Sequence, residues 1–364
     1  MRDQRRGRSA PRTACRSGER AVSDVNRAAR RLLSALSTGA ALFVAGSFLA
    51  ARRLAPRLVS PTGLGPAPDR QRELLDALSA ASPVVEEFRH RGSSLDPVEM
   101  AATFASPGDP ARRPTLLFLH GKGGRACEWE DSALLALGLG YNALLPDLRG
   151  HGSSAGRYTT FGFLEKDDLA NAIAAAQERF GVDPNRLGVH SCSAGSSVAL
   201  ELAAHRPAVR AVWLESPFAD AREMARHYLS ASTGIPAPLL SLATRWAVSR
   251  SVARVKRDLK LEHVPGGLEN TDPVAALRRV RCPVSLVYGD ADRLVPPHFV
   301  ERLVDALPPG SEVYRVRGAG HCHHPDEAAK VAHAEYRRRW TAFFGRHLPV
   351  SPTLESFADP SSGP

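Results

Sequence analysis

The chain is poor in cysteine and has no two cysteines in the C-x-x-C spacing of metal or redox motifs. Its five cysteines are scattered along the sequence as Cys15, Cys127, Cys192, Cys282 and Cys322. An odd and dispersed set is not the disulfide framework of a small secreted domain, and it lacks the ligand spacing of a structural zinc site. The pattern leaves room for one disulfide if the protein is exported.

Beyond its first 31 residues the chain also lacks a strong excess of either charge. Residues 1–31 hold ten arginines against three acidic residues, so +7 of the net charge of +10 lies there and only +3 in the rest. Nucleic-acid binding needs basic residues gathered on a folded surface, where they can follow the phosphates. We therefore expect no nucleic-acid partner, and the basic tail instead flanks an apolar segment.

That apolar segment, residues 32–51, is 20 residues without a charge, and arginines border it on both sides. A helix of this length is about 30 Å long and crosses the hydrocarbon layer of a membrane. The apolar part of a secretory signal is shorter, about 7–15 residues. We expect an uncleaved transmembrane anchor, with a cleaved signal peptide, a twin-arginine signal and a buried helix as alternatives. The arginines are denser before the segment, which favours a cytoplasmic tail and places the domain that follows on the non-cytoplasmic side.

From about residue 83 onward, short apolar runs alternate with helical segments. The runs VVEEFRHRG and VEMAATFAS predict a leading antiparallel pair, and TLLFLH, YNALLPD, RLGVHS, AVWLES and VSLVYG predict further strands. Such alternation is typical of an α/β fold, with a mostly parallel sheet and helices on both faces. Residues 218–272 interrupt the alternation with mainly helical sequence. An insertion there would cover the carboxyl ends of the strands, where open α/β sheets bind ligands, so we expect a short helical cap.

The expected organisation follows from these patterns. It comprises a basic disordered tail at 1–31, a transmembrane anchor at 32–51, a linker at 52–82 with a short helix near 70–80, the α/β domain at 83–347 with its cap at about 218–272, and a disordered tail at 348–364.

The stretch VHSCSAGSS, residues 189–197, joins a predicted strand to a predicted helix. A small-x-Ser-x-small pattern at such a junction is typical of the nucleophile elbow, whose strained turn brings the two small residues close together. With Ser193 as nucleophile, the small residues are Ser191 and Gly195. With Cys192 or Ser191 as nucleophile, a histidine or a valine would stand in one of these places. Ser193 is therefore the predicted nucleophile, and we expect Cys192 to be a small apolar filler.

A serine nucleophile needs a base, and the base needs an acid that orients it. In this type of fold the chain order is serine, acid, histidine. Asp290 and Asp292 follow the strand VSLVYG, and His321, His323 and His324 follow the strand EVYRVR, so both groups stand in the required order.

On these stretches the chain resembles the α/β-hydrolase superfamily over about residues 83–347. The matching segments are LLFLHGKGG, LLPDLRGHGSS, GVDPNRLGVHSCSAGS, DPVAALRRVRCPVSLVYGDADRLVPP and RVRGAGH. The resemblance implies an α/β-hydrolase fold in which Asp292, within G-x-x-D-x-x-V-P, is the acid and His321 is the base. Asp290 and Glu215 are rival acids. More narrowly, the chain is similar to small-capped, single-anchored hydrolases related to prolyl-oligopeptidase catalytic domains. It departs from the superfamily pattern at Ser191 and Ser196, where glycine is common.

An oxyanion hole requires two backbone N–H groups directed at the developing charge. We expect one from Ala194, the residue after the nucleophile, and one from Lys122 in the HGKGG loop. The side chain of Lys122 either attracts an anionic group or points to solvent.

Two further patterns have competing interpretations. The run His321, Cys322, His323 and His324 lacks partners with ligand spacing, so no metal site is expected. Residues 245–260 place valines on one helical face, and their basic residues outnumber the acidic ones. We interpret them as a cap helix whose basic side faces solvent. Alternatively, this basic side contacts anionic lipid headgroups.

Together these patterns predict a membrane-anchored serine hydrolase that cleaves carboxylic esters through a Ser-His-Asp triad and an acyl-enzyme, without cofactor or metal. The expected partners are a small acyl substrate, which includes lipid-derived ones, and the membrane. Alternatives are a peptidase or amidase, a thioesterase, and a non-catalytic binding module of the same fold.

Overall fold

The computed structural model describes residues 14–61, 65–264, 271–322 and 329–351. The chain divides into two compact units, Met1–Arg53 and Leu54–Pro364. Within the described residues of the first unit the backbone is helical, and the second unit contains the sheet and the candidate site.

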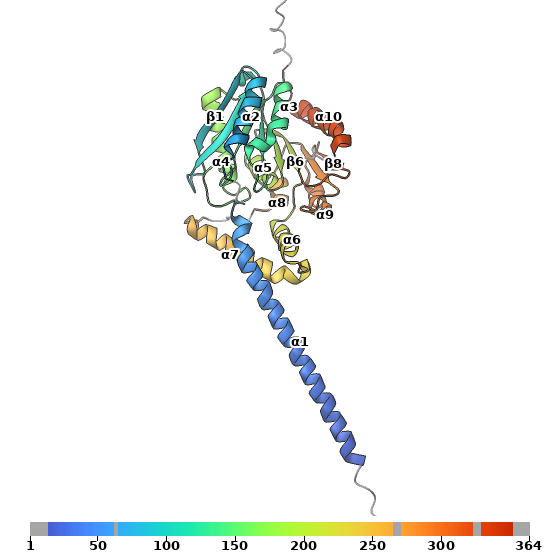
Figure 1. Ribbon diagram of the computed structural model, residues 1–364. Helices are drawn as coiled ribbons and strands as arrows, with labels where there is room; N and C mark the ends of the chain where they lie inside the picture. The colour runs from blue at the N-terminus through green and yellow to red at the C-terminus, as the bar shows by residue number, and fades with distance from the viewer. Residues whose placement is uncertain (1–13, 62–64, 265–270, 323–328, 352–364) are drawn as a thin grey trace, which may run out of the picture. The chain divides into compact units, whose positions relative to one another are not determined.

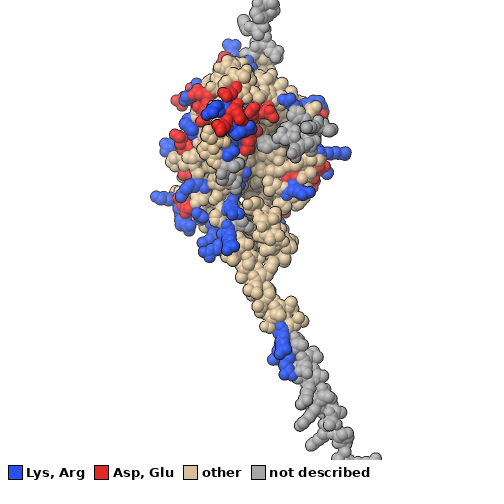
Figure 2. All heavy atoms as spheres, viewed as in Figure 1, with Lys and Arg blue, Asp and Glu red and all other residues tan. Residues whose placement is uncertain are grey.

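Helix α1 (Ala14–Val59) is longer than the predicted apolar segment at both ends. The expectation of a disordered tail at 1–31 is wrong from Ala14 onward, because alanine and arginine are good helix formers and continue the helix backward. Residues 1–13 lie outside the described part. The stretch Ala29–Val59 is long and apolar enough to cross a membrane, although a signal sequence has the same properties. Figure 2 shows that part of this helix has an uncharged surface.

The expected linker at 52–82 is largely helical. Helix α1 continues to Val59, and helix α2 (Pro68–Ala81) buries Leu74 and Leu78 completely. Because these two leucines belong to the hydrophobic core of the sheet, α2 is part of the folded unit and does not link it to another.

An eight-stranded sheet forms the centre of the second unit, in the order β1-β2-β4-β3-β5-β6-β7-β8. Strand β2 runs antiparallel to both of its neighbours, and the pairs from β4 to β8 are parallel. This is the predicted leading antiparallel pair followed by a parallel sheet. The strands are β1 (Val84–Arg91), β2 (Glu99–Ser106), β3 (Thr115–Leu119), β4 (Asn142–Pro146), β5 (Leu187–Cys192), β6 (Val209–Glu215), β7 (Val284–Gly289) and β8 (Glu312–Val316).

Helices cover both faces of the sheet, as the buried strands β3, β4, β5 and β7 require. One hydrophobic core packs the first face against α4 (Glu165–Phe180), α5 (Ala194–His205), α8 (Pro273–Leu277) and α9 (Pro297–Glu301). A second core packs the other face against α2, α3 (Glu130–Gly138) and α10 (Ala329–His347). Short 3₁₀ helices lie at η1 (Pro110–Arg112), η2 (Ala126–Trp129), η3 (Ala237–Leu240) and η5 (Val304–Ala306).

The cap region contains helix α6 (Ala221–Thr233), the 3₁₀ helix η3 and helix α7 (Ser241–Asp258). These elements lie between β6 and α8 in the chain, and α6 and α7 lie together at one end of the sheet (Figure 1). Residues 265–270 of the predicted cap lie outside the described part. The arrangement covers the end of the sheet at which β5, β6 and β7 terminate.

Candidate active site

The candidate nucleophile Ser193 lies in a sharp turn between β5 and α5. Its backbone has φ of 53° and ψ of −120°, a conformation that a non-glycine residue rarely adopts. The turn is held in place because the Ser193 N–H donates to the carbonyl of Glu215 at 2.8 Å. This is the geometry of a nucleophile elbow, in which a strand-to-helix turn exposes one hydroxyl above the sheet.

The two small residues beside the elbow serve different purposes. A Cβ at Gly195 would lie 2.5 Å from the His120 carbonyl oxygen and 2.6 Å from that of Leu119, so only glycine fits. Ser191 is fully buried, and its hydroxyl donates to Ser196 Oγ and to a backbone carbonyl of β6, each at 3.3 Å. The serine therefore fits where the superfamily commonly has glycine, because its hydroxyl finds partners.

Asp292 lies in the loop after β7 and accepts several hydrogen bonds. The backbone N–H groups of Leu294 and Val295 donate to its Oδ1 at 2.9 and 2.8 Å, and the Ser216 hydroxyl also donates to it. Burial by itself would raise the pKa of the Asp292 carboxyl. The hydrogen bonds from His321, Val295 and Ser216 outweigh the burial and hold the pKa below its ordinary value. Asp292 is therefore a carboxylate at neutral pH.

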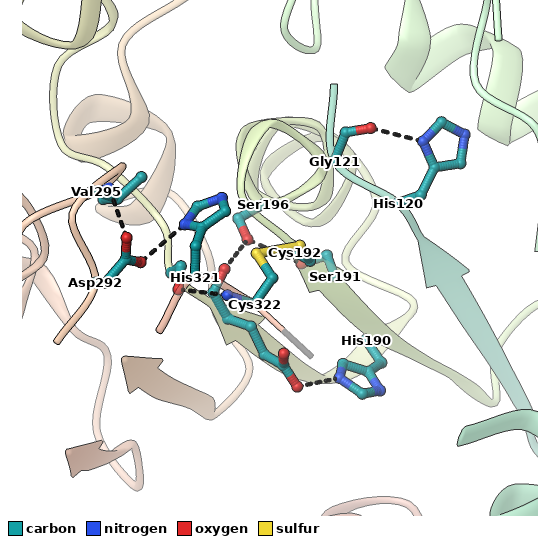
Figure 3. Close-up of a disulfide and its surroundings, with 12 residues drawn as sticks. His120, Gly121, His190, Ser191, Cys192, Ser196, Asp292, Val295, His321 and Cys322 are labelled. Atoms are coloured by element: carbon teal, nitrogen blue, oxygen red, sulfur yellow. Dashed lines mark hydrogen bonds and ion pairs between the residues drawn. A yellow bond between two sulfur atoms is a disulfide. The ribbon is translucent and has the colours of Figure 1, made fainter. Parts of the chain in front are cut away.

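His321 lies in the loop after β8, and its Nδ1 is 2.8 Å from Asp292 Oδ2 (Figure 3). Because Asp292 is ionised, the proton of the neutral imidazole lies on Nδ1, which donates a hydrogen bond to the carboxylate. Nε2 then has no proton and can accept one. The His321 side chain is partly exposed and lines the same cavity as Ser193. The structure thus brings the three predicted residues to one end of the sheet.

The rival acids have other partners. Asp290 accepts from the Gly318 N–H at 2.6 Å and from Arg315 at 3.3 Å, and thus braces the loop before His321. Glu215 is buried beneath the elbow, where it accepts from Tyr336 and from His190 Nε2. Neither makes the hydrogen bond to His321 that Asp292 makes. His323 and His324 lie outside the described residues.

The HGKGG loop holds the second candidate oxyanion amide. His120 Nε2 accepts from the Leu148 N–H at 3.0 Å, so His120 Nδ1 carries the proton and donates to the Gly121 carbonyl at 2.8 Å. This side chain fixes the backbone directly before Lys122. Lys122 and Ala194, whose amides we predicted as the pair, both line the cavity with the elbow serine.

The side chain of Lys122 follows neither of the two predictions made for it. Its Nζ donates to the carbonyl oxygens of Arg57 and Leu58 and thereby caps the last turn of α1. Burial lowers the pKa of Lys122 to about 8. No sequence pattern indicates this contact, because its partners are backbone atoms 64 and 65 residues away.

A cavity of about 440 Å³ opens beside Ser193 and His321. Its walls are mostly apolar and come from the cap, the end of α1 and the loops after the strands. The large apolar side chains are Leu58, Val59, Phe161, Phe218, Met224, Val248, Val252 and Leu294. Such a cavity suits an apolar group attached to the reacting centre.

Helix α7 lies with its apolar side toward the domain. Val252, Val255 and Leu259 pack with Val59 and Tyr158. The Arg254 and Arg257 side chains on α7 are 48% and 70% exposed, so its basic residues face solvent within the described part of the chain. An exposed basic side is expected both of a cap helix that faces solvent and of one that contacts anionic lipid.

Cys192 and Cys322 form a disulfide with 5.9 Å between their Cα atoms. The prediction that Cys192 is an apolar filler is therefore wrong. The two cysteines are 130 residues apart, and sequence spacing alone does not pair them. Cys127 and Cys282 are free and buried.

With this geometry established, comparison with known proteins identifies the family. A model of the alpha/beta hydrolase family matches residues 116–334, more than half of the chain, and the chain belongs to this family. The sheet order and the strand-to-helix turn at Ser193 are those of the alpha/beta hydrolase fold. The uncharacterized Mycobacterium tuberculosis protein Rv2307c is 32% identical over 213 residues, which are 57% of this chain and 63% of that protein. The match therefore spans less than two thirds of that relative.

Other relatives and solved structures extend the comparison. The magnesium-chelatase 30 kDa subunit of Rhodobacter capsulatus is 28% identical over 236 residues, covering 55% of this chain and 78% of that protein. The Pyrococcus furiosus esterase Pf2001 has a TM-score of 0.56 at 19% identity, covering 74% of this chain and 95% of that one. The Pyrococcus horikoshii acylaminoacyl peptidase has a TM-score of 0.52 at 16% identity, covering 73% and 42%. At these identities the structural likeness shows the fold alone.

The elbow geometry predicts that substitutions of its two flanking residues, Gly195 and Ser191, lower the free energy of unfolding by different amounts. Gly195→Ala forces a Cβ against two backbone carbonyls and should lower the free energy of unfolding by about 3 kcal/mol. Ser191→Ala removes two long hydrogen bonds and should lower it by about 1 kcal/mol or less. Urea unfolding of both variants measures the difference, and equal losses would contradict this account of the elbow.

Proposed function

We propose that the protein is a serine hydrolase that cleaves carboxylic esters through Ser193, His321 and Asp292. The observation that carries the proposal is the 2.8 Å hydrogen bond between His321 Nδ1 and Asp292, with His321 and Ser193 on one cavity. A base oriented by a buried carboxylate beside a serine in a strained elbow is the arrangement that activates a hydroxyl.

In the proposed reaction, Ser193 Oγ attacks the ester carbonyl carbon while His321 Nε2 takes the hydroxyl proton. Asp292 stabilises the imidazolium that forms and keeps the proton on Nδ1. The backbone amides of Lys122 and Ala194 donate to the oxyanion, and Ala194 is the first residue of helix α5, whose dipole favours negative charge there.

When the tetrahedral intermediate collapses, His321 returns the proton to the leaving alcohol, and the acyl group stays on Ser193. Water then attacks the acyl-enzyme with His321 again as the base. The same steps would cleave a thioester or an amide. The apolar cavity favours an ester with a hydrocarbon acyl chain, which includes lipid-derived substrates.

If Asp292 orients His321, its substitution should lower kcat far more than the same substitution of its neighbour Asp290. Asp292→Asn removes the carboxylate that orients His321 and should lower kcat about 10³- to 10⁴-fold on p-nitrophenyl butyrate. Asp290→Asn is the matched control and should leave kcat within about three-fold, because Asp290 contacts Arg315 and Gly318 rather than the histidine.

Ser193→Ala completes this series and should lose the ester hydrolysis that depends on the acyl-enzyme. An Asp290→Asn variant as impaired as Asp292→Asn would transfer the acid role to the other aspartate. Full activity of Ser193→Ala would refute the proposed mechanism.

The cavity predicts a preference for acyl chain length. Each buried methylene contributes about 0.8 kcal/mol, so kcat/KM on p-nitrophenyl esters should rise about four-fold per carbon until the chain fills the cavity. Val248→Trp places a large ring in the cavity and should lower kcat/KM for the octanoate about ten-fold or more, with the acetate changed less than about three-fold.

Val304→Trp is the control for this series, because Val304 is exposed and does not line the cavity. An equal loss on acetate and octanoate in the Val248→Trp variant would show that the cavity does not hold the acyl chain.

We further propose that residues 32–51, within the long apolar helix, are an uncleaved anchor and that the catalytic unit lies on the non-cytoplasmic side. The length and exposed apolar side chains of this helix support an anchor, and a disulfide in the folded unit is typical of an oxidising compartment.

The anchor predicts that the full-length chain stays with membranes during alkaline carbonate extraction. Leu36→Arg/Val44→Arg places two charges in the apolar segment, at about 2.5–3.5 kcal/mol each, and should release the chain. Val304→Arg/Val313→Arg changes two exposed residues elsewhere and should not. A mature N-terminus after residue 51, found by mass spectrometry, would instead identify a cleaved signal.

A further inference from the structure

The disulfide joins the two residues that adjoin the candidate catalytic side chains. Cys192 directly precedes Ser193, and Cys322 directly follows His321. Cys192 ends strand β5, whereas Cys322 lies beyond strand β8, and strands β6 and β7 separate these two in the sheet. The disulfide therefore bonds the nucleophile elbow covalently to the histidine loop across the end of the sheet (Figure 3).

Before the base, the histidine loop is held by Asp290, which accepts from the Gly318 N–H, and by the Ala319 carbonyl, which accepts from the Ala291 N–H at 3.0 Å. His321 is held by Asp292, and the Cys322 N–H donates to Ser216 Oγ at 3.3 Å. Cys322 has a positive φ of 51°, which a non-glycine residue adopts only when its surroundings hold it there. The bond to Cys192 supplies such a constraint at the residue adjoining the base.

We propose that the Cys192–Cys322 disulfide is a positioning element that keeps His321 within reach of Ser193, so that the hydrolase is active when oxidised and impaired when reduced. The proposal rests on the serine hydrolase function proposed above. Proton transfer requires the base within hydrogen-bond reach of the hydroxyl, and a displacement of about 1 Å can lower a rate about 10²-fold. Reduction frees the loop at the residue next to the base.

The reduction is a thiol–disulfide exchange. One thiolate of a dithiol attacks a cysteine sulfur, the Cys192–Cys322 bond breaks, and the second thiol of the reagent then resolves the mixed disulfide. The products are two cysteine thiols and the oxidised, cyclic reagent. Both cysteines are mostly buried but line the cavity, so a small dithiol reaches them by the route that the substrate uses. An acyl chain in the cavity should therefore slow the reduction.

The test uses the full-length chain in detergent, treated with dithiothreitol and then freed of it. Titration of the denatured protein should show two more thiols than before. We expect kcat on p-nitrophenyl butyrate to fall about ten-fold or more with KM changed less than about three-fold, and reoxidation should restore kcat. Circular dichroism at the assay temperature, recorded on both forms, separates a misplaced base from an unfolded protein.

Variants provide matched controls. Cys192→Ala/Cys322→Ala should have the low kcat of the reduced enzyme and no response to the reagent. Each single variant should lose as much as the double, since either one removes the whole bond. Cys127→Ala/Cys282→Ala removes the two buried free cysteines and should respond to the reagent as the unmodified chain does.

Two results would overturn this proposal and leave the proposed function intact. The first is full kcat in protein whose two additional thiols have been titrated. The second is the absence of a Cys192–Cys322 cross-linked peptide from an oxidised and active enzyme. An unmodified chain that hydrolyses no ester in either redox state would refute the hydrolase function and this inference together.

Discussion

The hydrogen bond between His321 and Asp292 is the interaction on which the proposed chemistry depends. It determines which imidazole nitrogen carries the proton. Burial raises the pKa of the Asp292 carboxyl, but His321 and the hydrogen bonds from Val295 and Ser216 outweigh the burial and hold this pKa below its ordinary value. The parallel sheet supplies the frame, because adjacent parallel strands end at the same edge and bring residues distant in sequence to one place. The elbow adds a serine held at an unfavourable φ by the backbone contact between Ser193 and Glu215.

The cavity beside Ser193 and His321 is lined by residues from several parts of the chain. The ends of the strands and the loops after them hold Ser193, Asp292 and His321, and cap helices α6 and α7 contribute part of the cavity wall. The end of α1 also contributes to the cavity, and Lys122 caps it through backbone carbonyls. The residue predicted to supply an oxyanion amide therefore also holds part of the cavity wall in place with its side chain.

Much of this arrangement could be predicted from the sequence, for identifiable reasons. Continuous apolar runs such as TLLFL predict buried parallel strands, and the order of Ser193, Asp292 and His321 follows from motifs whose residues contact one another locally. The partners of Cys192, Glu215 and the Lys122 side chain could not be predicted. Each depends on contacts between segments 25 or more residues apart, and only the folded chain brings these together. The continuation of α1 through Pro56 to Val59 was missed because the Pro/Gly composition of the following segment indicated a linker.

The central claim is that Ser193 is the nucleophile of this site, and covalent labelling tests it most directly. The oxidised, full-length chain would be reacted with a fluorophosphonate and analysed by intact mass and peptide mapping. The account predicts one adduct, located on Ser193 and absent from the Ser193→Ala chain. An adduct on a different residue, or none at all on a chain that hydrolyses esters, would contradict it.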